Sequence, residues 1–94
     1  MRDYNDPVYK EVRSRVLKRD KHCCQMPDCK TKKRLHVHHI IPWSKAAILR
    51  FEPSNLITLC HKCHESIKNQ EHLYESLFMG IARENANNQR HKRT

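Results

Sequence analysis

Glycine and proline are scarce in this sequence, with one glycine and four prolines in 94 residues. A chain so poor in turn residues does not fit a loop-rich secreted scaffold stapled by paired cysteines, and the odd count of five cysteines favours thiols over disulfides. Long apolar runs are also missing. None approaches the roughly 18 to 20 residues of a membrane helix, and the N-terminus lacks the apolar core of a signal peptide. These absences predict a cytoplasmic protein with reduced thiols and no membrane partner.

Acidic residues are scarce as well. The chain has 10 Asp and Glu against 19 Lys and Arg, which gives a formal net charge of +9. Such a field attracts polyanions and steers their association, so nucleic acid is the first partner to expect. Contacts with phosphate do not read the bases, so any sequence preference is expected to be weak or stays unknown. Such contacts also do not distinguish DNA from RNA. A merely soluble basic protein, or a binder of anionic membranes, is the alternative.

The length predicts a single domain over residues 1–94, since neither a repeat nor a linker divides the chain. A core this small contributes little net stability, so a metal staple is expected. Residues 7–19 predict a helix, capped by Asn5 or Asp6, with Val8, Val12 and Val16 on its buried side and Tyr9 and Leu17 beside them. The exposed side is predicted to carry the basic residues Lys10, Arg13, Arg15, Lys18 and Arg19.

Two short strands and a helical C-terminal region complete the predicted elements. The segments LHVHHIIPW (35–43) and SNLITLC (54–60) are short and rich in β-branched residues, as strands are. After Cys60 the pattern predicts helix with a break near Asn69, a helical extension over about 71–89 and a basic tail over 90–94. The apolar set of this region is Ile67, Leu73, Leu77, Phe78 and Ile81.

The cysteines form two close pairs and one extra thiol. Cys24 and Cys29 stand in CQMPDC, and Cys60 and Cys63 stand in CHKC. This spacing predicts one tetrahedral zinc site with four cysteine ligands, because each turn supplies two thiolates and the long loop between them closes over the metal. Cys23 could replace Cys24 as a ligand. Two disulfides, or a zinc site in which a histidine replaces one cysteine, are the alternatives.

Histidines are concentrated beside these cysteines. His36, His38 and His39 lie on the first predicted strand, and His61 and His64 lie at the second cysteine pair. A zinc ion holding the cysteines would bring the helix that carries His64 toward the strand that carries the other histidines. Such an arrangement predicts a second metal site with open coordination positions.

Four pieces of the sequence resemble the HNH endonucleases, the ββα-metal nuclease family. They are Arg19-Asp20 with Cys24 four residues beyond, HVHHIIP ending at Pro42, NLITLC from Asn55, and CHKCH from Cys60. The pieces follow the family's order and approximate spacing, from about Arg13 to Lys68. One departure is the first cysteine turn, where many members carry glycine and this chain has CQMPDCKTKK.

The resemblance implies a role for each matched residue. His39 would be the general base that takes a proton from the attacking water, and His38 and His64 would hold one divalent cation (Mg²⁺, Mn²⁺, Ni²⁺, Co²⁺ or Zn²⁺). Asn55 would bridge backbone groups across the loop and fix the orientation of His39. The structural Zn²⁺ would be held by Cys24, Cys29, Cys60 and Cys63.

The implied fold is small α+β: a ββα-metal (His-Me finger) core over about 13–68 with a two-stranded antiparallel hairpin and flanking N- and C-terminal helices, stapled by the zinc site. Neighbouring residues of a regular strand point to opposite faces. The resemblance therefore places His38 and His39 where the strand gives way to the loop. His36 shares a face with His38 and is predicted to be a surface residue, with extra ligand as the alternative. His61 and Lys68 are candidates for contacts with phosphate.

The implied function is metal-dependent hydrolysis of DNA phosphodiester bonds. An imidazole with a pKa of about 6.5 is a suitable base near neutrality, and two protein ligands leave room on the cation for the phosphate. A monomer with one active site would nick one strand, and double-strand cutting would need pairing. Phage or mobile-element DNA processing, with a packaging or processing partner, follows from the resemblance alone. A noncatalytic zinc-stapled DNA-binding module is the competing function.

Overall fold

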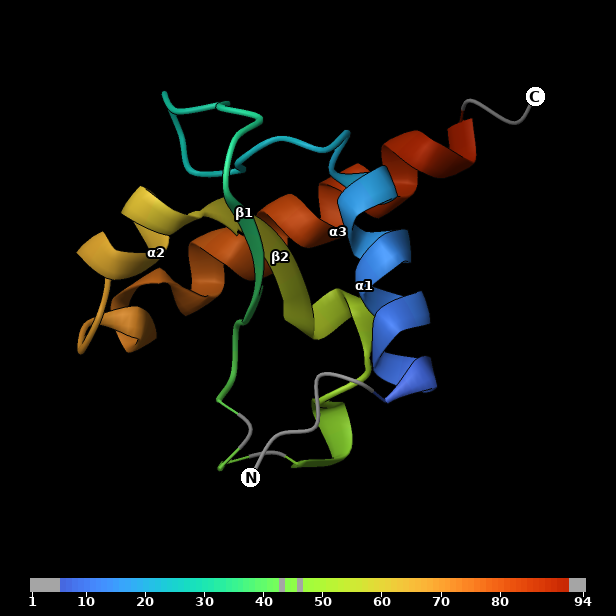
Figure 1. Ribbon diagram of the computed structural model, residues 1–94, viewed down its shortest axis with the longest axis horizontal. Coiled ribbons are helices and arrows are strands. Elements are labelled where there is room, and N and C mark those ends of the chain that lie inside the picture. The colour runs from blue at the N-terminus through green and yellow to red at the C-terminus, as the bar shows by residue number, and fades with distance from the viewer. Residues whose placement is uncertain (1–5, 43, 46, 92–94) are drawn as a thin grey trace.

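The computed structural model describes residues 6–42, 44–45 and 47–91. Its centre is an antiparallel hairpin of β1 (Leu35–His39) and β2 (Leu56–Cys60), in which Leu35 pairs with Cys60 and His39 with Leu56. The surrounding elements are α1 (Pro7–Arg19), η1 (Ala47–Leu49), η2 (Pro53–Asn55), α2 (His61–Ser66), η3 (Glu71–Tyr74) and α3 (Glu75–His91). In Figure 1, α1 and α2 flank the hairpin on opposite sides and α3 crosses behind it. The predicted small α+β fold is confirmed.

The helix α1 begins at a capping residue. The Asp6 side chain accepts a hydrogen bond of 2.8 Å from the Val8 N–H, and Pro7 occupies the first turn, where its missing N–H is no loss. The other predicted cap, Asn5, lies outside the described residues, as do Trp43 and the end of the basic tail, 92–94.

The buried side of α1 differs from the prediction at two residues. Val8 is 54% exposed, and the stripe facing the hairpin instead starts at Tyr9, because positions 9, 12 and 16 lie on one face of a helix. Arg19 was predicted to face solvent, but it is buried, since its guanidinium turns inward to pair with Asp20. Both errors concern the rotation of the helix and the choice of partners, which local spacing does not specify.

The strand β2 is buried along its whole length because helices cover both of its faces. On α1, Val12 and Val16 pack against Leu56 in one cluster. The larger cluster joins β2 to the C-terminal helices and to the cysteines, and contains Cys24, Ile40, Ile57, Leu59, Cys60, Ile67, Phe78 and Ala82. The larger cluster therefore lies between the hairpin and α3, and the smaller one lies between the hairpin and α1.

The C-terminal region breaks near Asn69, which has a φ of 69°. This left-handed residue redirects the chain between α2 and η3, so α3 starts at Glu75 with a new helical phase. Of the predicted apolar set, Phe78 is buried, but Leu73 and Leu77 are 67% and 43% exposed, so these two leucines do not belong to the packed face of the region. No helix among the described residues is long and apolar enough to cross a membrane.

A buried ion pair ties α1 to the hairpin. The Arg19 Nε–H and Nη2–H donate to the two carboxylate oxygens of Asp20 at 2.8 and 3.0 Å. The same guanidinium donates to the carbonyls of Pro53 (2.8 Å) and Leu56 (2.7 Å), which lie on either side of Asn55. The two carbonyls accept the guanidinium hydrogens that the carboxylate does not. A buried charge is tolerable when it is paired and its other hydrogen bonds are made in this way.

The carboxylate of Asp20 also collects hydrogen bonds from β2 and α3. It accepts from the Thr58 N–H at 3.0 Å and from Asn85 Nδ2 at 2.9 Å, and Asn85 also bonds Gln25 Oε1 at 2.9 Å. The Gln25 amide in turn donates to the Asp20 carbonyl at 2.9 Å. Asp20 thus connects α1, β2 and α3 through its carboxylate, and the loop that carries the first cysteine pair through its carbonyl.

We expect Asp20→Ala to lower the free energy of unfolding by about 3–5 kcal/mol, because Arg19 would stay buried without its counter-charge and the Thr58 N–H would lose its acceptor. Urea denaturation of the zinc-loaded protein measures the loss. Glu11→Ala is the matched control, because it breaks the exposed 3.6 Å pair with Arg15 and should cost no more than about 0.5 kcal/mol. Equal losses in the two variants would contradict the role of the buried pair.

Candidate active site

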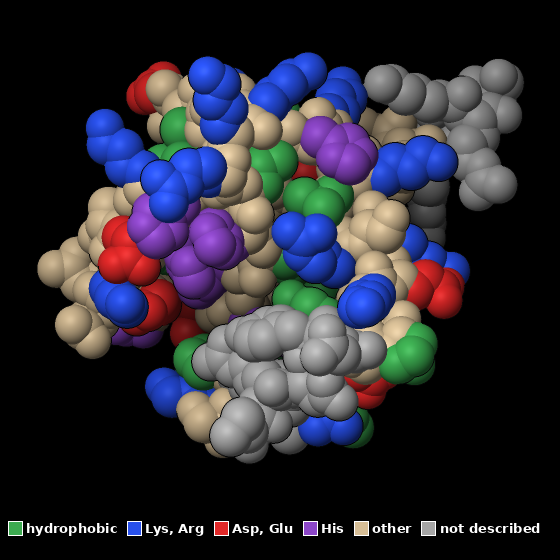
Figure 2. All heavy atoms as spheres, viewed as in Figure 1, with side chains coloured by type: hydrophobic (Ala, Val, Ile, Leu, Met, Phe, Trp, Pro, Cys, Tyr) green, Lys and Arg blue, Asp and Glu red, His purple; other side chains and the backbone are tan. Residues whose placement is uncertain are grey.

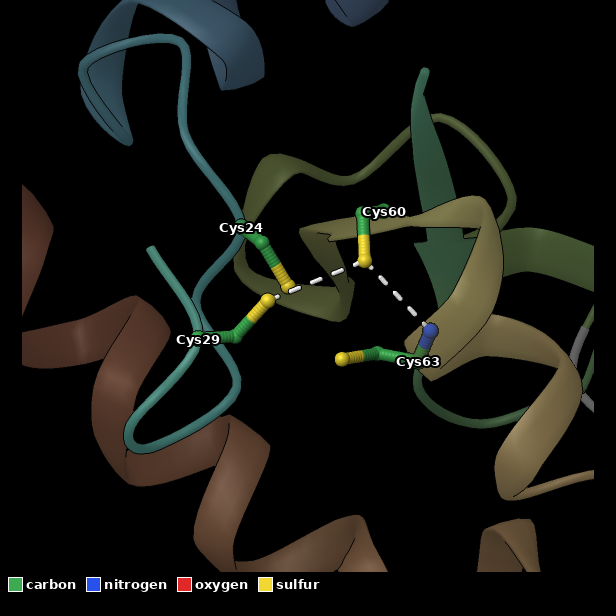
Figure 3. A group of neighbouring side chains, drawn as sticks. All are labelled: Cys24, Cys29, Cys60 and Cys63. Atoms are coloured by element: carbon green, nitrogen blue, oxygen red, sulfur yellow. Dashed lines mark hydrogen bonds between the residues drawn. The ribbon is translucent and has the colours of Figure 1, made fainter. Parts of the chain in front are cut away.

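Four cysteines from distant parts of the chain meet beside the hairpin. Cys24 and Cys29 come from the loop between α1 and β1, Cys60 ends β2 and Cys63 lies in the first turn of α2. Figure 3 shows their side chains pointing toward one another. All four sulfur atoms lie within 4.8 Å of one another, and the Cys29 and Cys60 sulfurs are 3.8 Å apart. Sulfurs bound to one tetrahedral zinc at about 2.3 Å are roughly 3.8 Å apart, so this group could hold a zinc ion.

The electrostatics of the cysteines also suit a cation. Burial opposes ionisation of Cys60, but the Cys63 backbone N–H and the neighbouring thiols lower its pKa to about 7. Burial raises the pKa of Cys24, and burial together with the adjacent sulfurs raises the pKa of Cys63. Ionising all four thiols side by side is therefore unfavourable without a positive ion between them, which zinc would supply.

The remaining cysteine is not part of this group. The Cys23 thiol donates to the Asp20 carbonyl at 3.3 Å, whereas Cys24 is fully buried and faces the other three sulfurs. Each of the five cysteines is a free thiol, so the structure contains neither of the two disulfides considered as an alternative. The placement of Cys24 agrees with the predicted choice between these two neighbours.

The first cysteine turn is built from left-handed residues without glycine. Asp28 and Lys30 have φ values of 71° and 59°, and Arg34 just before β1 has a φ of 53°. The turn is closed by the Cys24 N–H bond to the Thr31 carbonyl at 2.8 Å. Side chains with a Cβ adopt this backbone conformation at a cost of roughly 1–2 kcal/mol per residue. The departure from the glycines of the family therefore leaves the turn in place but strains it.

The structure brings His38 and His64 together. Their ring centroids are 5.2 Å apart, and the His38 ring also meets Phe78 edge-on at 5.8 Å. His38 is 6% exposed, and its Nε2 atom has no hydrogen-bond partner among the described residues. A buried, unpartnered ring nitrogen beside a second imidazole is suited to ligating a metal ion.

Both rings are held in the neutral form that binds metals. Burial, with a smaller contribution from His64, lowers the pKa of His38 to about 4. Burial also lowers the pKa of His64, and the nearby His36 acts in the same direction. The lowered pKa values favour neutral imidazoles near neutral pH, whose lone pairs are available to a cation.

His39 lies on the opposite face of β1, against α1. Its ring stacks on Tyr9 with centroids 6.5 Å apart, and Tyr9 in turn meets Phe51 at 6.2 Å. The His39 Nε2 is 3.0 Å from the Arg50 carbonyl oxygen. A carbonyl only accepts hydrogen bonds, so this contact assigns a ring hydrogen to Nε2, and in the neutral imidazole the basic lone pair is then on Nδ1.

Asn55 connects the loop after β1 to η1. Its Oδ1 accepts from the Ile41 N–H at 2.9 Å, and its Nδ2 donates to the carbonyls of Ile41 (3.2 Å) and Leu49 (3.5 Å). The side chain is 1% exposed, so these bonds are shielded from water. Leu49 precedes Arg50, whose carbonyl contacts His39, and Asn55 therefore restrains the segment that holds this imidazole.

All of these histidines border one cleft of about 1010 Å³. His38 and His39 both reach it, although they point to opposite faces, because β2 is the only described strand that pairs with β1 and the other edge of β1 is open. The cleft is lined by Tyr9, Lys10, Arg13, His36, Val37, His38, His39, Pro42, His64, Lys68 and Glu71. Figure 2 shows histidines gathered over β1 and α2 with charged side chains around them.

Two residues that line the cleft, Tyr9 and Glu71, were not predicted from the sequence as part of the site. Tyr9 was predicted only as an apolar neighbour of the valines on the N-terminal helix, and not as a residue of the site. Glu71 was also missed; its carboxylate acts electrostatically on both His38 and His64. Its distance in sequence from the matched motifs gives no local signal, because only the break after α2 turns it back toward the cleft.

The comparisons with known proteins agree with this geometry. The family model of the HNH endonucleases matches residues 22–70, just over half of the chain. No curated protein and no solved structure gives a significant match. The matched range contains both cysteine pairs, the hairpin and the histidines of the cleft. The chain belongs to the HNH endonuclease family, whose members are generally nucleases and typically bind nucleic acid.

Proposed function

We propose that this protein is a metal-dependent DNA endonuclease, with residues 1–94 acting as a single HNH nuclease domain. The observation that carries the proposal is the arrangement of His38, His64 and His39 around one edge of β1. The imidazoles of His38 and His64 meet there, and the Nε2 atom of His38 has no hydrogen-bond partner among the described residues. The imidazole of His39 borders the same cleft and is held by a backbone carbonyl.

His38 and His64 would hold the divalent cation. The fit rests on the 5.2 Å separation of their rings and on the unpartnered Nε2 of His38. When bound, the cation neutralises charge on the scissile phosphate and on the departing 3′ oxygen. Two protein ligands leave the remaining coordination positions for water and phosphate.

His39 would act as the general base. With the hydrogen of its ring on Nε2 and directed at the Arg50 carbonyl, Nδ1 can take the proton from the attacking water. The stacked ring of Tyr9 limits rotation of the imidazole. Asn55 would be a positioning residue, because it fixes Ile41 and Leu49 on the two sides of the loop.

DNA would enter along the cleft through its phosphates. Lys10 and Arg13 of α1 and Lys68 after α2 border the histidines, and the chain carries a net charge of +9. Contacts of this kind are sequence-tolerant and weaken steeply with salt. A structural zinc in the cysteine group would hold α2, and with it His64, against the hairpin.

A single cleft of this kind would cut one strand, so the monomer would be a nickase and double-strand cutting would require pairing of two sites. A role in phage or mobile-element DNA processing is proposed from the family resemblance alone. The net charge and the cysteine group would equally serve a noncatalytic DNA-binding module, so cleavage itself must decide between the two functions.

Nicking of supercoiled plasmid, after removal of loosely bound metal and addition of Mg²⁺, Mn²⁺, Co²⁺, Ni²⁺ or Zn²⁺ in turn, tests the proposal. We expect cleavage by the parent and a loss of about 10²-fold or more in His64→Ala, because the cation would lose a ligand. His72→Ala, which replaces an exposed histidine of η3, is the control and should cleave normally. Zinc content must stay constant across all three proteins. DNA binding without cleavage by the parent under any of these metals would favour the binding module instead.

A further inference from the structure

A third imidazole faces the proposed cation site. His36 lies two residues before His38 on β1, so both side chains project from the same face of the strand. The His36 ring centroid is 5.7 Å from that of His64, and the His38 ring centroid is 5.2 Å from that of His64. The His64 ring therefore contacts two histidines of the same strand.

These separations are close to those of imidazoles bound to one ion. With metal–nitrogen distances of about 2.0–2.1 Å, two imidazoles on a tetrahedral ion have ring centroids roughly 5 Å apart. Side chains at positions i and i+2 of a strand start roughly 7 Å apart, a span that two inward-turned imidazoles can close on one ion. His38 and His64 already have the required spacing, and His36 is slightly wider.

Closing the site requires a rotation of His36. Among the described residues, only the four cysteines have ligand atoms that all lie within 4.8 Å of one another, so the three imidazoles are not yet in ligating geometry. His36 is exposed, and its ring is free of the tight packing that fixes His38 against Phe78. A turn about its side-chain torsions therefore moves its nitrogen toward the other two without disturbing the core.

Two neighbouring side chains are weaker candidates for the third ligand. The His61 ring meets His36 at 5.4 Å, but His61 does not line the cleft that His36, His38 and His64 share. Glu71 lines the cleft and acts electrostatically on His38 and His64, but a carboxylate would favour oxygen-preferring ions such as Mg²⁺ and Mn²⁺.

We propose that His36 completes a three-imidazole site with His38 and His64, which selects Ni²⁺, Co²⁺ or Zn²⁺ over Mg²⁺ and Mn²⁺. Imidazole suits ions of intermediate hardness, such as Ni²⁺, Co²⁺ and Zn²⁺, better than the hard ion Mg²⁺. Three imidazole ligands still leave an open coordination position for water or phosphate. This inference rests on the proposed function in one respect, namely that His38 and His64 bind the cation.

Calorimetric titration of the zinc-loaded protein with Ni²⁺ and, separately, with Mn²⁺ tests the inference without relying on cleavage. We expect His36→Ala to weaken Ni²⁺ binding by about 10-fold or more and Mn²⁺ binding by less, so that the ratio of the two affinities falls. His61→Ala is the matched control and should leave both affinities unchanged. X-ray absorption at the Ni²⁺ edge should count three imidazoles in the parent and two in His36→Ala.

The outcomes separate this inference from the proposed function. If His38→Ala and His64→Ala lose Ni²⁺ while His36→Ala binds it like the parent, the third-ligand role is overturned and the two-histidine site stands. A larger loss in Glu71→Gln than in His36→Ala would overturn it in favour of the carboxylate. If the parent binds no Ni²⁺ beyond its zinc, both the inference and the proposed cation site fail. Since His36 is exposed, its variants should retain the zinc content and circular dichroism of the parent.

Discussion

Replacing His39 with alanine is expected to reduce DNA cleavage by about 10²–10⁴-fold while leaving the fold, the zinc content and the affinity for Ni²⁺ unchanged. The reason lies in the two faces of β1. His38 faces α2 and α3, where the cation would bind, whereas His39 faces α1 and stacks on Tyr9. Removing the His39 ring therefore deletes the proposed base without deleting a proposed ligand.

Single-turnover cleavage of a supercoiled plasmid, with enzyme in excess, measures the chemical step in this variant. His72→Ala again serves as the histidine control, and addition of free imidazole to His39→Ala should restore part of the lost rate because the vacated space can admit a base. A His39→Ala protein that cleaves like the parent would rule out the assigned base, even if the cation site is retained.

Replacing Cys60 with serine is expected to abolish zinc binding and leave the chain largely unfolded at 25 °C. Cys60 ends β2, is 4% exposed, and its sulfur accepts the Cys63 N–H at 3.4 Å, so it joins the hairpin to α2. Structural zinc sites contribute about 10–16 kcal/mol in small zinc-dependent domains. The net stability of a whole domain is only about 5–15 kcal/mol, so loss of the metal exceeds what packing alone can replace.

Zinc stoichiometry and far-ultraviolet circular dichroism test this expectation. Cys23→Ser is the matched control, since Cys23 is adjacent to Cys24 in sequence but bonds the Asp20 carbonyl instead of joining the sulfur group. It should keep one zinc ion and a normal thermal transition. A folded, zinc-free Cys60→Ser protein would show that the hydrophobic core holds the hairpin and α2 together without the metal.

Much of the fold could be predicted because it depends on local patterns. The two cysteine pairs, the short β-branched segments and the capped helix each carry their information within a few residues, and the hairpin with flanking helices follows from them. The rotation of the helices could not be predicted. Arg19 is buried because its partners include the carbonyls of Pro53 and Leu56, which only the folded chain brings near. Likewise, the exposure of Leu77 follows from the break at Asn69.

The candidate site was predictable in its membership more than in its geometry. The cysteines meet as their spacing indicates. His38 lies against His64, as expected if a zinc ion bound to the four cysteines draws α2 toward β1. Alternation along the strand predicts opposite faces for His38 and His39, but only the open edge of β1 lets both border one cleft. The contact of His39 with Tyr9 needed the position of α1. The roles assigned to these side chains stay predictions until cleavage and metal binding are measured.

The glycine-free turn around the first cysteine pair bears on how the protein would respond to its supply of metal. The turn holds three residues in left-handed conformations, namely Asp28, Lys30 and Arg34. An unfolded chain would leave these conformations, so part of the free energy of zinc binding offsets their strain. By mass action, each tenfold fall in free zinc, while the ion is in excess of its dissociation constant, lowers stability by about 1.4 kcal/mol. We therefore expect the population of folded molecules to rise and fall with the concentration of free zinc.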